Sequence, residues 1–238
     1  MKTLGVIGGL GPMATARLLT RVIEMTDAET DQEHLDVIVF NRPQVPDRTA
    51  YLLDPANHPS PLPSMQATAK TLESVGAQVL CAPCVTAHCY FSDLAGAVSV
   101  PFINMAEETA EALAAAGKKK IGILATSGTV KTGLFQQVFS RHGLDFAIPG
   151  DEGQKQVMEI IYDEVKAGLP VDAKKVEAVC AEMFALGCDC LVLGCTELSL
   201  IPKELLPEQR TLDALDVLAQ RCVSVCGGAL RKEFVNLL

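Results

Sequence analysis

Short apolar runs alternate with longer stretches of helical period along this chain. A run of consecutive apolar residues is typical of a β-strand that is covered on both faces. The pattern predicts strands at residues 4–7, 35–40, 78–82, 100–103, 121–125, 145–148 and 190–193. Because these strands alternate with helices, the pattern predicts an α/β fold with parallel-type sheets.

Two of the predicted helices show their period clearly. In residues 172–186 the apolar positions recur at spacings of three and four residues, and the pattern stops at Gly187. Residues 105–116 have the same form and stop at Gly117. Both helices therefore have one face suited to packing on a sheet.

The chain also repeats itself weakly at an offset of about half its length. The stretch GAQVLCAPC at residues 76–84 aligns with GCDCLVLGC at residues 187–195. Residues 4–7 likewise resemble residues 121–124, and both runs lead into a turn and a helix. The repeat indicates that one α/β unit occurs twice.

Two similar, pseudosymmetric α/β domains follow from this repeat. We expect the first domain at residues 1–105 and the second at residues 106–212. Residues 213–238 are expected to form a closing helix that returns to the first domain. Ligands of open parallel sheets bind beyond the carboxyl ends of the strands, so the active site is expected in the cleft between the domains.

Composition narrows the classes of function. A net charge of −9 argues against a nucleic-acid ligand, whose phosphates attract clustered lysine and arginine. The one basic cluster, residues 118–120, follows a predicted helix end, where it complements the helix dipole. No apolar run reaches the length of a membrane span. Residues 1–7 lead directly into a strand rather than a signal peptide, and we expect a cytoplasmic protein.

Nine cysteines raise the question of which are chemically active. The number is odd and the chain is not small, so we expect free thiols rather than a disulfide framework. Cys84 and Cys195 occupy corresponding positions in the repeat, each just past a predicted buried strand. Two pseudosymmetric domains would place them on opposite sides of one cleft. The alternative is that both are buried structural thiols.

A racemase needs two such opposed groups, because one removes the α-proton and the other returns a proton to the opposite face. Thiols suit this role, since their ordinary pKa of about 8.5 leaves both protonation states accessible near neutral pH. Cys81 and Cys84 also form a C-x-x-C pair, which is found at zinc and redox sites. Cys81 falls within a predicted strand and Pro83 intervenes, so this reading is less favoured.

The glycine-rich stretch GGLGPMA at residues 8–14 follows the first predicted strand and opens a helix. It fits a loose dinucleotide-binding pattern. The acidic residue expected near the second strand is absent, although Arg42 there would suit the 2′-phosphate of NADP. The other reading is that backbone N–H groups of Gly9, Leu10 and Gly11 bind a substrate carboxylate.

Residues 41–63 form one irregular stretch with six prolines, and a long irregular segment in a compact domain is usually functional. Arg48 lies in it. His88, four residues past Cys84, is either a structural histidine or a group that tunes the thiol. A predicted turn opens a helix of the second domain with Thr126, Gly128 and Thr129. These residues suit helix capping, which is compatible with anion binding.

Four stretches together resemble the motifs of the aspartate/glutamate racemase family. They are GGLGPMAT at residues 8–15, PQVPDRT at 43–49, PCVTAH at 83–88 and LGCTEL at 193–198. They occur in the family's order, and the resemblance runs along nearly the whole chain. It is closest to the aspartate racemase branch, since cell-wall glutamate racemases usually carry a histidine where this chain has Glu197.

The resemblance implies a homodimeric isomerase that interconverts L- and D-amino acids without pyridoxal phosphate, metal or other cofactor. Cys84 and Cys195 match the family's catalytic cysteines. Arg48 and Lys166 match the residues that hold the substrate's distal carboxylate. The expected substrate-binding residues are Gly9, Leu10, Gly11, Arg48, Val85, Thr86, Thr126, Gly128, Thr129, Lys166, Thr196 and Glu197.

Val85 departs from the family pattern, which has asparagine at this position. That asparagine helps to hold the amino-acid head group, and valine offers no hydrogen bond there. We expect racemisation of an acidic amino acid, with aspartate preferred over glutamate. The alternatives are an isomerase or decarboxylase of a small dicarboxylate, or a dicarboxylate-binding protein whose turnover is impaired.

Overall fold

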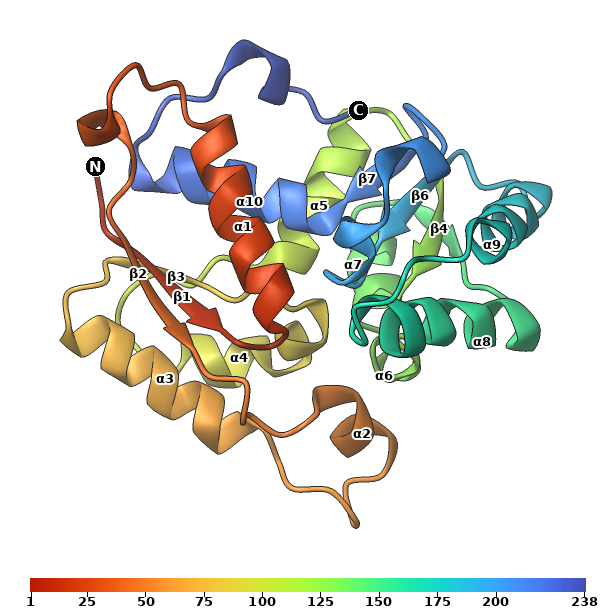
Figure 1. Ribbon diagram of the computed structural model, residues 1–238, viewed down its shortest axis with the longest axis horizontal. Helices are drawn as coiled ribbons and strands as arrows, with labels where there is room; N and C mark the ends of the chain where they lie inside the picture. The colour runs from red at the N-terminus through yellow and green to blue at the C-terminus, as the bar shows by residue number, and fades with distance from the viewer.

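The computed structural model describes all residues from Met1 to Leu238. They form two parallel sheets, ordered β2-β1-β3 and β5-β4-β6-β7, with helices packed against them (Figure 1). The strands are β1 (Leu4–Gly8), β2 (Val37–Asn41), β3 (Val79–Cys81), β4 (Lys120–Leu124), β5 (Asp145–Ala147), β6 (Cys190–Leu193) and β7 (Thr211–Asp213). The predicted α/β class with parallel sheets is confirmed.

Ten α-helices connect and cover these strands. They are α1 (Pro12–Met25), α2 (Arg48–Leu53), α3 (Leu62–Ser74), α4 (Phe91–Ala95), α5 (Met105–Ala115), α6 (Ser127–Thr132), α7 (Leu134–Arg141), α8 (Asp151–Glu159), α9 (Ala173–Ala185) and α10 (Ala214–Cys226). None of these helices combines the length and the apolar composition of a membrane-spanning segment.

The register of the strands fixes where the two cysteine-bearing segments begin. β1 pairs with β3 so that Val6 lies opposite Cys81, the last residue of β3. β4 pairs with β6 so that Leu124 lies opposite Leu193, the last residue of β6. All residues of β1, β3 and β6 are buried, as their continuous apolar sequences predict. Each cysteine therefore follows a short distance after a fully buried strand.

The predicted strand at residues 100–103 is wrong. Only one bridge forms there, between Phe102 and Leu80. Pro101 accepts a hydrogen bond from Leu80 N through its carbonyl, but it has no N–H with which to continue a ladder. Strand β7 was not predicted, because a strand of three residues carries too little periodicity.

The prolines of residues 41–63 predicted one irregular stretch, but part of this stretch is helical. Helix α2 forms there, and Asp47 caps it by accepting a hydrogen bond from Ala50 N at 2.8 Å. Helix α3 then begins at Leu62, with proline at its first turn. Figure 1 shows α2 below the two sheets, where it contacts α6. This segment is thus an ordered cover for the second sheet's carboxyl edge.

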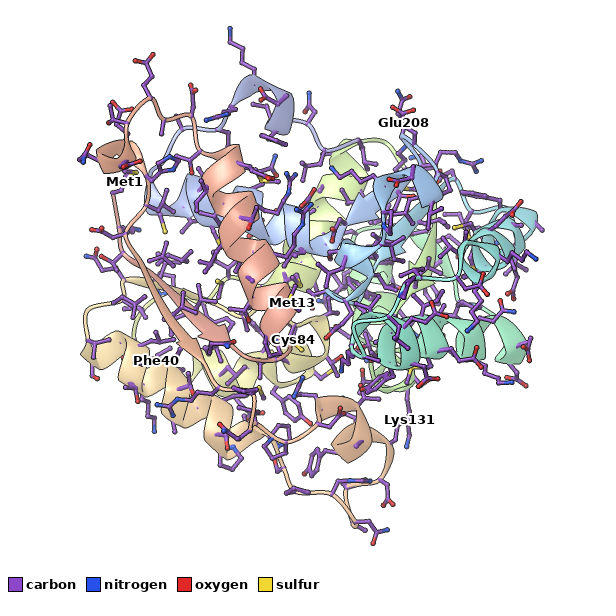
Figure 2. The ribbon with its side chains drawn as sticks, viewed as in Figure 1. Met1, Met13, Phe40, Cys84, Lys131 and Glu208 are labelled. Atoms are coloured by element: carbon purple, nitrogen blue, oxygen red, sulfur yellow. The ribbon has the colours of Figure 1, made fainter.

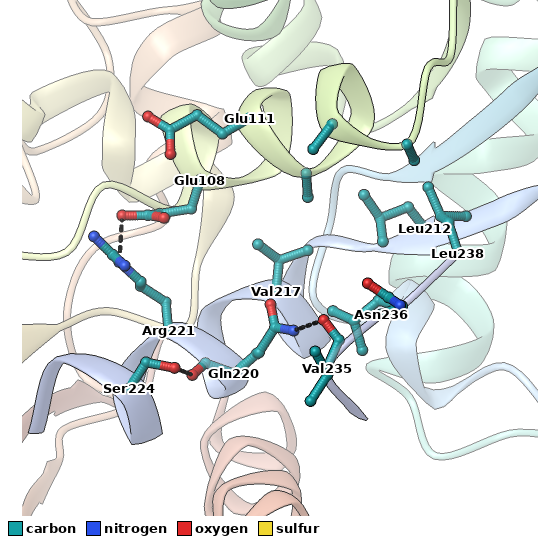
Figure 3. A pocket seen from close by; sticks show the side chains of 14 residues that line it. Glu108, Glu111, Leu212, Val217, Gln220, Arg221, Ser224, Val235, Asn236 and Leu238 are labelled. Carbon is teal, nitrogen blue, oxygen red and sulfur yellow. Dashed lines mark hydrogen bonds and ion pairs between the residues drawn. The ribbon is translucent and has the colours of Figure 1, made fainter. Parts of the chain in front are cut away.

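Helix α10 lies between the two sheets, since it contacts β3 and β7 as well as α1 and α5 (Figure 1). It ends at Gly227, whose φ of 86° is the left-handed conformation that favours glycine. The chain then runs over α10 and α5, and Gln220 donates to the carbonyl of Val235 at 3.0 Å. A cavity of about 380 Å³ lies under this tail (Figure 3). The division into residues 1–105, 106–212 and 213–238 stays a prediction.

Candidate active site

Cys84 and Cys195 line one small cavity, although they follow strands of different sheets. Figure 2 labels Cys84 near the middle of the molecule, below the N-terminal end of α1. The cavity has a volume of about 10 Å³, which is about the space of one water molecule. Its lining consists of Leu10, Asp47, Arg48, Thr49, Cys84, Val85, Thr86, Thr126, Tyr162, Lys166, Cys195, Thr196 and Glu197.

Gly194 explains how Cys195 reaches the cavity directly after β6. A Cβ atom at Gly194 would lie 2.7 Å from the ring of Phe135 and 3.1 Å from the carbonyl oxygen of Leu124. Only glycine therefore lets the chain turn this close to β4. Gly194 N donates to that same carbonyl of Leu124 at 2.7 Å. The hydrogen bond holds the segment that carries Cys195 against the sheet edge.

Arg48 is the cation beside Cys84. Its Nη2 donates to Leu10 O at 2.6 Å, and its Nη1 donates to Pro46 O at 3.0 Å and Val45 O at 3.3 Å. Burial lowers the pKa of Arg48, but the nearby Cys84 and Asp47 outweigh burial and leave that pKa raised. The guanidinium is thus fixed, buried and charged.

The Nε atom of Arg48 is buried and has no hydrogen-bond partner. A buried donor without a partner is costly, so this N–H is available to an acceptor that enters the site. A carboxylate or a thiolate would satisfy it. Arg48 therefore combines a structural role towards Leu10, Val45 and Pro46 with one open donor.

Glu197 is the anion beside Cys195. The Cys195 thiol donates to Glu197 Oε2 at 3.0 Å, and both side chains are buried. Burial raises the pKa of Cys195 well above its ordinary value, and the charge and hydrogen bond of Glu197 raise it further. Lys166 Nζ lies 3.8 Å from Glu197 Oε1. The same Nζ lies 4.0 Å from the centre of the Tyr162 ring, a cation–π contact.

Three threonine hydroxyls form a closed triangle; Thr86 and Thr126 line the cavity, whereas Thr129, although expected in the site, does not. Thr86 Oγ1 lies 3.2 Å from Thr126 Oγ1 and 3.0 Å from Thr129 Oγ1, and Thr126 and Thr129 are 3.1 Å apart. Thr126 also caps α6 by accepting a hydrogen bond from Thr129 N. On the other wall, Thr196 Oγ1 donates to Pro83 O at 3.1 Å. These contacts tie each cysteine segment to residues that follow the other sheet.

Residues 7–222 match the family model described as Asp/Glu/Hydantoin racemase. This chain belongs to that family. Its fold is similar to that of the aspartate racemase from Picrophilus torridus, with a TM-score of 0.86 and 30% identity over 100% of this chain and 99% of that one. The predicted family and the predicted class of enzyme, an amino-acid racemase and hence an isomerase, are confirmed.

Two further proteins are similar to this chain at lower identity. The chain is 24% identical over 226 residues to the broad specificity amino-acid racemase RacX of Bacillus subtilis (strain 168), covering 93% of this chain and 96% of RacX. It shares the fold of an aspartate racemase homologue from Pyrococcus horikoshii OT3. In that case the TM-score is 0.76 and the identity 23%, covering 95% of this chain and 99% of that one.

Gly9, Gly11 and Gly128 each allow a close approach to a different part of the chain. Gly9 has a φ of 88°, and a Cβ there would lie 2.4 Å from the backbone of Arg42. Its N–H donates to Thr15 Oγ1 at 3.0 Å and is not free for a ligand. A Cβ at Gly11 would lie 2.9 Å from Glu197 Oε1, so Gly11 leaves room for that carboxylate. Gly128 allows close approach to Thr49 of α2, where a Cβ would lie 3.0 Å from Cα.

A larger chamber of about 430 Å³ adjoins the small cavity. The two spaces share Asp47, Arg48, Lys166 and Glu197 as a common wall. Gly9 and Gly11, from the turn before α1, line only the larger chamber. The charged side chains therefore separate the two cysteines from a roomier outer space.

Val85 is almost fully buried, with 2% of its surface exposed, and it belongs to the same apolar cluster as Ile103 and Met105. It also contributes to the lining of the small cavity. The polar contacts on this side come instead from the threonine triangle. Val85 thus contributes core packing and no hydrogen bond at this position.

Cys81 and Cys84 lie in different apolar clusters, with Cys81 among the residues around α10 and Cys84 among those around α3. They therefore do not form one exposed pair, as a C-x-x-C redox site requires. His88 Nδ1 lies 2.9 Å from Cys84 O and its Nε2 lies 3.3 Å from Ile103 O. Burial lowers the pKa of His88. Its contact with Cys84 is to the backbone, so it supports the segment structurally.

Sequence reasoning missed Asp47, Thr49 and Tyr162 as lining residues. The Tyr162 hydroxyl donates to Asp47 Oδ2 at 3.2 Å. Burial raises the pKa of Asp47, but a hydrogen bond from Ala50 N and the charges of Lys166 and Arg48 lower it overall. The proximity of Asp47 and Thr49 to Arg48 in the motif PQVPDRT was a usable signal. No signal marked Tyr162, because it lies in a π-helical segment, η3 (Ile160–Val165).

Proposed function

We propose that this protein racemises an acidic amino acid, aspartate in preference to glutamate, with Cys84 and Cys195 as its two proton-transfer groups and without a cofactor. The observation that carries the proposal is that both buried thiols line the same cavity, one from each sheet edge. Membership of the racemase family supports it. The similarity to the Picrophilus torridus aspartate racemase favours aspartate as the substrate.

In this mechanism one cysteine acts as a thiolate and the other as a thiol. The thiolate removes the α-proton from one face, which leaves a carbanion whose charge spreads into the α-carboxylate. The thiol then gives its proton to the opposite face, and the two cysteines have exchanged protonation states.

The charge that develops on the α-carboxylate needs fixed hydrogen-bond donors. In our proposal the hydroxyls of Thr86 and Thr126, which line the cavity, turn from their mutual contacts to donate to the head group, while Thr129 supports them from the same triangle. Thr196 completes the head-group contacts from the opposite wall. The unpartnered Nε of Arg48 then faces the distal carboxylate together with Lys166.

The cavity must widen to admit an amino acid, since its present volume is about that of one water molecule. The adjoining chamber of about 430 Å³ offers the route of access. The hydrogen bond between Tyr162 and Asp47 crosses from η3 to the cap of α2. We propose that this contact breaks when substrate enters and forms again around the bound substrate.

Proton exchange in D₂O tests the proposed function. Each enantiomer of aspartate and glutamate is incubated with the protein, and loss of the α-proton signal and of optical rotation are followed together. We expect the α-proton signal and the optical rotation both to disappear, and to do so faster with aspartate than with glutamate. A Cys180→Ala variant, which alters a buried thiol of α9 outside the cavity, is expected to behave like the unaltered protein. No exchange with any of the four substrates between about pH 6 and 9 would refute the proposal.

Val85 is the observation that favours a second candidate. Its apolar side chain provides no partner for a substrate ammonium group, whereas Arg48 and Lys166 remain as cations. A small dicarboxylate without an amino group would suit such a wall, in an isomerase or decarboxylase reaction. Assays with maleate and with a substituted malonate distinguish this candidate, as does binding without turnover.

The homodimer and the cytoplasmic location expected from the sequence stay predictions. So does the NADP reading of the glycine-rich turn, in which Arg42 was to contact the 2′-phosphate. In the structure the Arg42 guanidinium stacks over the Phe40 ring at 5.2 Å. A thermal-shift measurement with NADP tests that reading independently of racemisation.

A further inference from the structure

The two sulfur atoms of the cavity have neighbours of opposite charge. Cys84 lies beside the buried guanidinium of Arg48, which has an open N–H donor. Cys195 instead donates its own hydrogen to Glu197. A carboxylate only accepts hydrogen bonds, so this contact exists while the sulfur of Cys195 carries its proton.

Glu197 is held so that one oxygen always faces the thiol. Its Oε2 accepts from Cys195 at 3.0 Å, and its Oε1 lies 3.8 Å from Lys166 Nζ. The same Oε1 sits against Gly11 at the start of α1, where a Cβ would lie only 2.9 Å away. The N-terminal end of α1 and the Lys166 ammonium both lie beside this carboxylate. The hydrogen-bond acceptor for the Cys195 thiol is therefore fixed in position beside two positive groups.

Other charged or titratable groups around Cys195 are few. Lys166 and Tyr162, both from the η3 region, face it from one side, and Glu197 faces it from its own segment. Arg48 and Asp47 complete the shared wall. Lys166 alone would favour a thiolate at Cys195, but burial and Glu197 have the larger effects. The balance of these groups favours the thiol.

We propose that Glu197 is a positioning residue that keeps Cys195 protonated in the resting protein, so that Cys84 is the base with which a turnover from rest begins. The inference rests on the proposed two-cysteine function and adds a direction to it. After one turnover Cys84 carries the proton and Cys195 is the thiolate. Proton exchange with solvent then restores the resting form, in which Cys195 again donates to Glu197.

This bias makes the two enantiomers kinetically unequal. The enantiomer whose α-hydrogen faces Cys84 binds the resting form. The other enantiomer binds the form in which Cys195 is the thiolate, which is the minority form of the free protein. Enantiomers have equal free energy, so kcat/KM must be the same for both. The enantiomer that needs the minority form therefore shows a higher KM and a higher kcat, raised in the same ratio. We expect Glu197→Gln to bring the ratio of the two KM values and the ratio of the two kcat values closer to one.

Alkylation of the two thiols by iodoacetamide tests the inference directly, because the thiolate is the reactive form. The rate at each cysteine is measured by peptide mass spectrometry between about pH 6 and 10 in the unaltered protein, in Glu197→Gln and in Glu204→Gln. Glu204 is an exposed glutamate in the nearby turn η5 (Lys203–Leu205) and serves as the matched control. We expect Cys84 to react faster than Cys195 in the unaltered protein and in the control.

In Glu197→Gln the rate profile of Cys195 should move to lower pH, with a rate at pH 8 at least about tenfold higher, while that of Cys84 changes little. Glu197→Asp, which keeps the charge, should restore most of the slow reaction. An unchanged Cys195 profile in Glu197→Gln would overturn the inference. An equal rise at both cysteines would also overturn it, since that result indicates only a loosened cavity. These rates need no turnover, so they are informative even if racemisation itself is absent.

Discussion

Cys84 and Cys195 occupy the same position in two similar backbones, yet their surroundings differ in charge. Each lies two or three residues beyond the end of a buried strand, and each segment is tied across the cavity by a threonine. The neighbour of Cys84 is an arginine that three backbone carbonyls hold in place, whereas the neighbour of Cys195 is a glutamate that accepts the thiol hydrogen. The repeated fold thus brings the two sulfurs together, and the side chains around them make them unequal.

The residues that support the two cysteine segments from behind also differ, in whether they change charge near neutral pH. His88 backs the Cys84 segment through a carbonyl contact, and burial lowers the pKa of this histidine. The Cys195 segment continues into η4 (Leu198–Leu200), where Ser199 donates to Asp213 Oδ1 at 2.7 Å. Burial and the charge of Asp216 raise the pKa of Asp213 to about 7. One support therefore stays neutral, and the other changes charge near neutral pH.

Replacing each sulfur in turn should have the largest effect. In Cys84→Ser and in Cys195→Ser we expect racemisation of aspartate to fall by about 10²- to 10⁴-fold, the usual contribution of a positioned acid or base. Each variant should still exchange the α-proton of one enantiomer with D₂O, and the two variants should select opposite enantiomers. Proton NMR of each enantiomer measures this. If both variants exchanged the same enantiomer, the two sulfurs would not act on opposite faces.

The location of these two cysteines could be predicted from the sequence, because the repeat places them at matching strand ends. The inequality between them could not be predicted so fully. Glu197 was expected to contact substrate, and only the fold reveals that its carboxylate points at the thiol two residues earlier. Arg48 was expected to lie in an irregular segment. Its backbone contacts depend on a six-residue helix that is too short to leave a periodic pattern.

The two cations of the site give a second, intermediate effect. Arg48→Lys loses the fixed fork that reaches Leu10, Val45 and Pro46, and leaves buried carbonyls without a donor. We expect the free energy of unfolding to fall by about 1–3 kcal/mol. Lys166→Gln removes a looser ion pair and a cation–π contact on a side chain that is 28% exposed. It should cost less than about 1 kcal/mol.

Urea unfolding of both variants checks this difference, with racemisation measured beside it. Both variants should be poorer racemases, but only Arg48→Lys should also be clearly less stable. Equal losses of stability would mean that Arg48 has no special structural role towards α2. A fully stable Arg48→Lys variant would mean that a lysine ammonium can satisfy the same carbonyls.

The smallest effect at neutral pH concerns the support behind Cys195. The folded pKa of Asp213, about 7, lies above its ordinary value of 3.8, so the folded state holds this proton more tightly than the unfolded state. Its contribution to stability is full below about pH 4 and is lost as the pH rises through 7. Asp213→Asn keeps an oxygen that accepts from Ser199 and from Leu215 N, but it cannot ionise.

We therefore expect the melting temperature to fall less between pH 5 and pH 8 in Asp213→Asn than in the unaltered protein. The difference should be about 5–10 °C, because a pKa of about 7 in place of 3.8 corresponds to about 2–3 kcal/mol between these two pH values in a chain of this size. Calorimetry at the two pH values measures it, with His88→Gln as the comparison on the Cys84 side. An Asp213→Asn variant with the same pH dependence as the unaltered protein would contradict this account.

The class of the fold follows from its apolar runs, and the long helices follow from their period. The exceptions have local physical causes. Pro101 prevents a ladder where the apolar run at 100–103 favoured a strand. β7 forms because it pairs with β6, and its own three residues carry no strand pattern. Tyr162 lines the cavity from a segment where the backbone changes from α-helical to π-helical winding. Neither composition nor residue spacing predicts such a change.

That change of winding has an evolutionary consequence. In η3 the N–H of Lys166 bonds to the carbonyl of Ile161, five residues back, at 3.0 Å. Such a wide turn contains one residue more than an α-helix needs over the same height. Deleting that residue would restore a regular helix, and the residues beyond it would keep their direction because the wide turn absorbs the extra residue locally. Tyr162 and Lys166 would then be three residues apart instead of four, and their side chains would enter the cavity at different angles. A change of one codon could therefore remodel the substrate wall while both sheets and both cysteines stayed as they are.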